Sequence, residues 1–325
     1  MNNSLFTRTR PFAFFILGAG CLFSNCPSDI ALLLGVAFAL VAGNPFDVLT
    51  RKAIKRLLAY SIIGLGAGMN LVVVAKVGLS GLEYTALGIG FALLAGRLLG
   101  KLFRTENDLS WLISFGTAIC GGSAIAALAP VLHAKDHSIS VALGVVFVLN
   151  AVALVAFPFI GHMLHMPEAQ FGLWSALAIH DTSSVVGAGL QYGPEALAVG
   201  TTVKLARALW IVPLVFAIQA FESWRRTGAE GEAQEAVRPK IPWFILGFLL
   251  MAAVATWVPG VSEPADMIAF AAKRCLVLTL FLIGSTLTPH ALRTVGFAPF
   301  LQGVSLWLLV SASSLTAILW IGVGV

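Results

Sequence analysis

The sequence predicts an all-α polytopic membrane protein, and three observations support this fold class. The chain has 325 residues, of which 58% are hydrophobic and only 11% charged, whereas soluble globular chains carry about a quarter charged residues. The mean hydropathy is +0.93. Several long stretches contain no Asp, Glu, Lys or Arg at all, and a helix needs about 20 mostly apolar residues to cross the hydrocarbon core. These stretches are residues 109–134, 138–160, 241–262 and 294–325.

Hydropathy divides the chain into about eleven transmembrane helices. They form one transporter domain over residues 1–325. The tenth helix contains Lys273 and Arg274, which either line a water-filled vestibule or lie at the outer surface. The predicted spans are residues 11–24, 29–43, 54–75, 80–98, 109–133, 138–160, 170–190, 196–220, 241–258, 264–289 and 297–322.

Basic residues gather in alternate connections between these spans. Cytoplasmic loops of membrane proteins are enriched in Lys and Arg, so the chain is predicted to have a cytoplasmic N-terminus and an external C-terminus in a bacterial plasma membrane. Loop charges account for the net charge of +5, and we expect no nucleic-acid partner. Residues 222–240, a polar stretch, are predicted to be a cytoplasmic linker between helices 8 and 9. The basic connections are residues 8–10, 51–56, 97–104 and 225–240.

A short internal echo suggests inverted repeats. Residues 53–56 and 271–274 both read Ala-x-Lys-Arg, and a glycine follows at the same spacing, at Gly66 and Gly284. The predicted topology runs the two segments in opposite directions, as inverted repeats require.

The first polar cluster lies midway along the fifth predicted span and contains Thr117, Cys120, Gly121, Gly122 and Ser123. Adjacent glycines weaken a helix by about 1 kcal/mol each. A broken helix beginning near Gly122 would direct its first N–H groups and its positive dipole end at an anion. The alternative is close helix packing through small residues.

The second cluster, in the seventh predicted span, is the run His180, Asp181, Thr182, Ser183 and Ser184. An ionisable residue at membrane depth costs at least a few kcal/mol unless it faces a partner or water. Because the polar run exceeds one helical turn, it favours an unwound segment or a helix end in a cavity. The alternative is a structural network in which Asp181 caps the following amides and His180 contacts a neighbouring helix.

The third cluster consists of Lys204 and Arg207, which lie three residues apart and so share one face of a helix. They would attract an anionic substrate or pair with Asp181, unless they extend to an interface. Asn150, a polar residue within the sixth span, is expected to form an interhelical hydrogen bond.

Other patterns indicate neither a metal nor an enzyme. His162 and His165 have no evident third ligand, so we expect no metal site and no cofactor. A disulfide between Cys21 and Cys26 is left open. Motifs typical of zinc peptidases and serine hydrolases are missing from the sequence, so an intramembrane enzyme is the least favoured reading.

The ordered motifs at residues 116–125, 180–189 and 203–207 resemble the YeiH-type sulfate exporters over most of the chain. Ala206 stands where that family has a threonine. The resemblance implies an inner-membrane secondary transporter distantly related to cation–proton antiporters and bile-acid symporters. Such folds contain inverted repeats and discontinuous helices that cross near the midplane.

We therefore expect export of sulfate or a related small sulfur-containing anion, coupled to protons through His180 and Asp181. The expected partners are a small inorganic or organic anion, protons or sodium ions, the lipid bilayer and, as an option, a second copy of the chain. The alternative is a cation–proton antiporter that uses Asp181. The expected substrate-binding residues are Thr117, Cys120, Gly121, Gly122, Ser123, Thr182, Ser183, Ser184, Lys204 and Arg207.

Overall fold

The computed structural model describes residues 3–24, 26–226, 243–286 and 296–321. Within these residues the chain forms helices and no strands, which confirms the predicted all-α class. The helices are α1 (Asn3–Phe23), α2 (Ser28–Val41), α3 (Asp47–Ala67), α4 (Leu71–Leu102), α5 (Asn107–Ala118), α6 (Gly122–Leu132), α7 (Asp136–Met163), α8 (Glu168–Ala178), α9 (Thr182–Tyr192), α10 (Pro194–Ala208), α11 (Ile211–Arg226), α12 (Trp243–Trp257), α13 (Ser262–Ser285) and α15 (Phe297–Ile321).

Several of these helices are suited to a bilayer. Five segments of the described chain are long and apolar enough to cross a membrane, and further apolar helices are shorter. One of the five is formed by α10 and α11 together, with a break at Leu209 and Trp210. The predicted linker at 222–240 lies outside the described residues from 227 onward. The five segments are Tyr84–Leu102, Asp136–Met163, Pro194–Ala220, Ser262–Ser285 and Phe297–Trp320.

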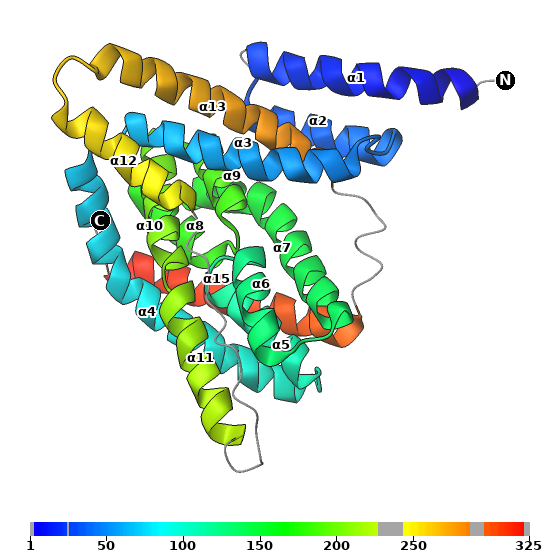
Figure 1. Cartoon of the computed structure of the whole chain (residues 1–325), viewed down its shortest axis with the longest axis vertical. Coiled ribbons are helices and arrows are strands. Elements are labelled where there is room, and N and C mark those ends of the chain that lie inside the picture. The colour runs from blue at the N-terminus through cyan, green and yellow to red at the C-terminus, as the bar shows by residue number, and fades with distance from the viewer. Residues whose placement is uncertain (1–2, 25, 227–242, 287–295, 322–325) are drawn as a thin grey trace.

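One group of helices, called here the bundle, consists of α1, α2, α3, α12 and α13. α13 lies along α2 and α3, and α12 packs on α3 (Figure 1). Gly35 of α2 and Gly284 of α13 let two backbones approach, because a Cβ on Gly35 would collide with the carbonyl oxygen of Phe281. The echoing segments 53–56 and 271–274 lie on α3 and α13, and a repeat relationship between them stays a prediction.

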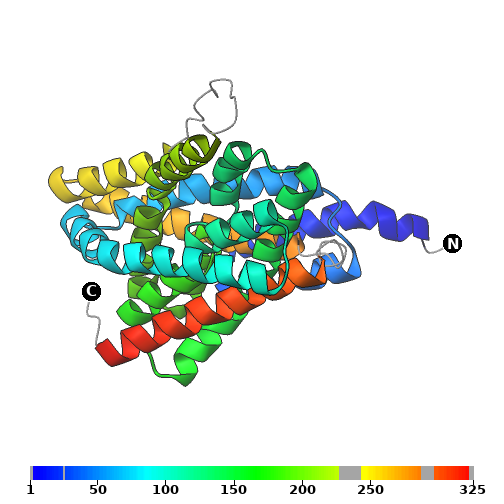
Figure 2. The ribbon, with the colours of Figure 1, turned by 90° about the horizontal axis from the view of Figure 1, so that it is seen from below.

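The second group, called here the core, consists of the helices from α4 to α11 together with α15. Figure 2 shows α15 running along the α4 side of the core, and α15 contacts α4, α5, α7 and α8. Buried Gln302 of α15 donates to the Gly96 carbonyl at 3.0 Å and to the Ser110 hydroxyl at 3.0 Å. The indole of Trp174 donates to the Ser311 carbonyl at 3.0 Å. These bonds fix α15 against α4, α5 and α8.

The fifth and seventh predicted spans are each interrupted, as their polar runs predict, but the reversal of direction within each span was not predicted. Each consists of two short helices that turn back on each other: α5 with α6, and α8 with α9. The Glu168 carboxylate at the start of α8 accepts from the Glu195 amide at 2.8 Å, just beyond the end of α9. In the first hairpin, the Cβ position of Gly116 lies 3.0 Å from the Ile125 side chain. Helices of 11 or 12 residues extend only about 17 Å, roughly half the hydrocarbon thickness.

The two hairpins open toward opposite ends of α7. The first packs along the beginning of α7, since α6 ends at Leu132 just before α7 starts, and Gly121 lies against Val146. The second packs along the end of α7, where Gly161 lies against Phe171 and Tyr192. The tips of both hairpins therefore meet near the middle of this long helix.

Candidate functional site

The tip of the first hairpin is residues 119–121, between α5 and α6. Ile119 leaves the helical conformation with φ −121° and ψ −86°. Gly121 has φ 66° and ψ −123°, a conformation that side-chain-bearing residues rarely adopt. α6 then begins at Gly122, so the predicted broken helix is confirmed at the predicted position. The first N–H groups of a helix have no intrahelical acceptor.

The tip of the second hairpin is residues 179–181, between α8 and α9. The Asp181 carboxylate accepts from the Ser184 amide at 2.6 Å and caps the N-terminus of α9. Asn150 of α7 accepts through its side-chain oxygen from the amides of His180 at 3.1 Å and Asp181 at 3.3 Å. The predictions of an unwound segment and of an interhelical bond by Asn150 are confirmed. The cap by Asp181 belongs to the structural network that was the alternative interpretation of this run.

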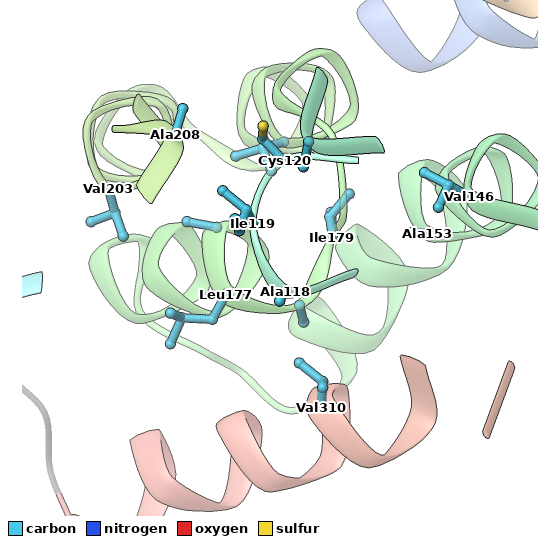
Figure 3. Packing of buried hydrophobic residues seen from close by; sticks show 14 of the residues in the cluster. Ala118, Ile119, Cys120, Val146, Ala153, Leu177, Ile179, Val203, Ala208 and Val310 are labelled. Carbon is cyan, nitrogen blue, oxygen red and sulfur yellow. The ribbon is translucent and has the colours of Figure 1, made fainter. Parts of the chain in front are cut away.

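The two tips touch each other. The Cβ position of Gly121 lies 3.3 Å from the Cβ of Asp181, so the N-terminal ends of α6 and α9 are brought together. Figure 3 shows Ile119 and Ile179 at this junction, with Val203 of α10 on one side and Val146 of α7 on the other.

Lys204 and Arg207 bind the C-terminal ends of α5 and α8, where these helices run into the two tips. Arg207 donates from Nε to the Ala118 carbonyl at 2.7 Å, at the end of α5. It also donates from Nη1 to the Leu177 carbonyl at 2.6 Å, at the end of α8. Lys204 donates from Nζ to the carbonyls of Ile179 at 2.6 Å and Ala176 at 3.2 Å. Both cations have 0% exposure, and among the described residues neither forms an ion pair with Asp181.

This arrangement separates the two kinds of helix end. Helix C-termini carry partial negative charge and helix N-termini partial positive charge. Lys204 and Arg207 donate hydrogen bonds at the C-terminal ends of α5 and α8. The first turns of α6 and α9 contain no acidic residue. Asp181, the N-cap of α9, is the acidic side chain nearest to these ends. The junction therefore offers backbone donors next to one titratable carboxylate.

The predicted site residues divide by exposure. Ser123 is exposed, and Gly122, Asp181, Thr182 and Ser183 are partly exposed, so these could meet a ligand directly. The others are buried behind them: Thr117, Cys120, Gly121, His180, Ser184, Lys204 and Arg207.

Several buried polar atoms around the tips have no hydrogen-bond partner among the described residues. They are Thr117 Oγ1, both ring nitrogens of His180, Asn150 Nδ2 and Arg207 Nη2. Buried polar groups are nearly always hydrogen-bonded in native proteins. These unpaired atoms gather at the tips, where water or a bound ligand would supply the missing hydrogen-bond partners.

The sequence leaves open whether Lys273 and Arg274 line a water-filled vestibule or lie at the outer surface, and in the structure they lie on α13 and line a cavity apart from the tips. The hairpins differ from the sequence prediction in one respect. Hydropathy did not predict that the chain reverses direction within each hairpin, because two apolar half-helices together are as long as one transmembrane span. The signal available was the position of each polar run at the centre of its predicted span. Cys21 and Cys26 carry free thiols.

Comparison with known proteins places this chain among bacterial membrane proteins. The family model described as Conserved hypothetical protein 698 matches residues 22–303. UPF0324 membrane protein Bd1437 of Bdellovibrio bacteriovorus is 56% identical over 317 residues, covering 97% of this chain and 96% of that protein. UPF0324 membrane protein GSU2818 of Geobacter sulfurreducens is 48% identical over 309 residues, covering 95% and 96%. No solved structure matches the chain.

Proposed function

This chain belongs to the Conserved hypothetical protein 698 family of UPF0324 membrane proteins, the YeiH-type family, and we propose that it is a secondary transporter that exports a small oxyanion. Sulfate or a related sulfur-containing anion is the proposed substrate class. The observation that carries the proposal is the meeting of two helix N-termini at the hairpin tips, where a Cβ placed on Gly121 would lie 3.3 Å from the Cβ of Asp181.

The chemistry of the tips supports an anion. Sulfate presents oxygens that accept hydrogen bonds, and the first amides of α6 are donors aimed away from the helix. In α9 the amides of Thr182 and Ser183 have the same role, while Asp181 occupies the Ser184 amide. The hydroxyls of Ser123, Thr182 and Ser183 add further donors at the same junction. Lys204 and Arg207 support the site from behind by neutralising the C-terminal ends of α5 and α8. In this role they position the half-helices and do not contact the anion.

The membrane potential supports export as the proposed direction of transport. One elementary charge gains about 2.3 kcal/mol per 100 mV, so a dianion leaving a negative-inside cell gains about 4.6 kcal/mol per 100 mV. Export of sulfate therefore needs no additional ion gradient. Protonation of the partly exposed Asp181 would let the same site respond to pH, with His180 buried beside it.

The experiment is efflux of radiolabelled sulfate from proteoliposomes with an imposed potassium diffusion potential. We expect efflux to accelerate when the interior is negative. Replacing two hydroxyls in the Thr182→Val/Ser183→Val double variant should raise the KM at least about tenfold, because hydrogen bonds to charged groups contribute about 1.5–3 kcal/mol each. Thr316→Val, which removes an exposed hydroxyl on α15, is the matched control. Sulfate efflux equal to that of protein-free vesicles would refute the proposal.

A cation–proton antiporter is the second candidate, and one observation favours it. The Asp181 carboxylate is partly exposed at the junction and has no cationic partner among the described residues. A carboxylate in that position could bind sodium. Sodium-driven proton flux in vesicles without sulfate, abolished by Asp181→Asn, would select this candidate over the exporter.

A further inference from the structure

A cavity of about 560 Å³ lies where the bundle meets the core, apart from the hairpin tips. The bundle contributes the start of α2 and the middle of α13, and the core contributes the ends of α7 and α9. The lining residues are Pro27, Ser28, Pro158, His162, Leu190, Gln191, Phe270, Lys273, Arg274 and Val277.

The charged residues among these are cations. Within the described residues, the Lys273 ammonium has no recorded hydrogen bond or ion pair and its side chain is exposed. Arg274 is oriented by two bonds, from Nε to the Leu22 carbonyl at 3.0 Å and from Nη2 to the Cys21 carbonyl at 2.9 Å. Those bonds leave Nη1 of the guanidinium for another acceptor.

The remaining lining residues do not neutralise this charge. None of the described lining residues is Asp or Glu. The ring of His162 stacks on Tyr192 with centroids 4.3 Å apart, which fixes the imidazole at the cavity wall. Two cations in a concave surface whose described lining residues include no carboxylate focus a positive potential there. An anion with several oxygens would match both the ammonium and the guanidinium.

The position of the cavity relates it to the tips. α9 runs from Thr182 at the tip to Tyr192, and Gln191 near its end lines the cavity. Gln191 lies nine positions after Thr182 along the helix, a rise of about 14 Å. The cavity therefore lies one hairpin length from the tips, at the end toward which the second hairpin opens.

We propose that this cavity is a second oxyanion site, a vestibule that binds a tetrahedral oxyanion through Lys273 and Arg274. The assignment of its occupant to the transported anion rests on the proposed function above. A phosphate group of a lipid headgroup presents the same oxygens, so the test has to distinguish a free anion from a lipid.

The experiment counts radiolabelled sulfate bound to protein in nanodiscs of zwitterionic lipid. We expect two sulfates per wild-type chain and one in Lys273→Gln. Lys273→Arg, which keeps the charge, should retain two, and so should Lys101→Gln, which removes an exposed lysine at the end of α4. Thermal unfolding of each variant, compared with wild type, shows whether it is folded. Failure of the proposed function alone would give one sulfate in wild type and none in Lys273→Gln.

The second arm repeats the count in nanodiscs containing phosphatidylglycerol. Loss of one sulfate in wild type, with no change in Lys273→Gln, would support the site and identify lipid as its occupant. An unchanged count would support the free anion. Equal sulfate binding by wild type and Lys273→Gln, together with equal binding of phosphatidylglycerol, would overturn the proposal.

Discussion

The two hairpins share a plan but achieve their reversals by different means. The first tip has the sequence Ile119-Cys120-Gly121. Its reversal depends on backbone conformation, because Gly121 has φ 66°. The second tip, Ile-His-Asp, depends on side chains: Asp181 caps α9 and Asn150 binds two tip amides. The first tip therefore contributes Gly121, whose lack of a side chain allows the two tips to approach closely. The second tip contributes the ionisable side chains of His180 and Asp181.

The two buried cations, Arg207 and Lys204, differ in how many hairpins each one contacts. Arg207 bonds carbonyls at the ends of both α5 and α8, so it links the hairpins to each other. Lys204 bonds carbonyls of the second hairpin, at Ala176 and Ile179. Replacing each in turn therefore separates the stability of the tip junction from that of one hairpin.

The largest expected effect is that of Arg207→Met. The carbonyls of Ala118 and Leu177 lose their side-chain donor in a buried site, and we expect the free energy of unfolding to fall by about 3–5 kcal/mol. The first tip should also loosen, so Cys120, now 5% exposed, should react faster with a membrane-permeant maleimide. The measurements are thermal unfolding and alkylation rate, with Lys101→Met as control. A Cys120 rate equal to that of wild type would show that Arg207 does not link the hairpins.

Lys204→Met should have a smaller effect, confined to the second hairpin. The loss of two bonds to backbone carbonyls should lower the free energy of unfolding by about 2–3 kcal/mol. Cys120 alkylation should stay close to the wild-type rate, in contrast to Arg207→Met. A rise in Cys120 reactivity as large as in the arginine variant would remove the distinction between the two cations.

Neighbouring glycines offer a matched pair of substitutions at the first tip. Gly121→Ala forces a side chain into a φ of 66° and places its Cβ 3.3 Å from Asp181, which should cost about 1–3 kcal/mol and weaken sulfate binding. Gly122→Ala lies within α6, where the nearest atom would be 3.4 Å away, and should leave the melting temperature within about 2 °C of wild type. Equal melting temperatures and equal sulfate affinities for the two variants would contradict the role assigned to Gly121.

The smallest effect on stability is expected for Asp181→Asn. Asparagine caps a helix about as well as aspartate, so the free energy of unfolding should change by less than about 0.5 kcal/mol. Sulfate efflux should nevertheless lose its dependence on pH if Asp181 carries the proton. Efflux measured from pH 5 to 8 in both proteins provides the check, and an unchanged pH profile would assign the coupling to another group.

Much of the architecture could be predicted from composition and pattern. Apolar length and low charge predict the helices, and the glycine pair at 121–122 and the His180–Asp181 run mark both breaks at the correct residues. The reversal of each chain segment could not be predicted in this way. It depends on tertiary contacts, such as Glu168 with the Glu195 amide, that local hydropathy does not encode. The burial of Lys204 and Arg207 against carbonyls is equally a property of packing.

Because α7 is one continuous helix that contacts both tips, the number of residues between its two contact points is constrained. Val146 contacts the first tip and Asn150 binds the second, so four residues of one unbroken helix fix the distance between the tips. One inserted residue there would shift Asn150 by about 1.5 Å and rotate it by roughly 100° away from its two amides. The interval between Val146 and Asn150 should therefore be intolerant of insertions, while exposed Phe147 within it can change to other apolar residues.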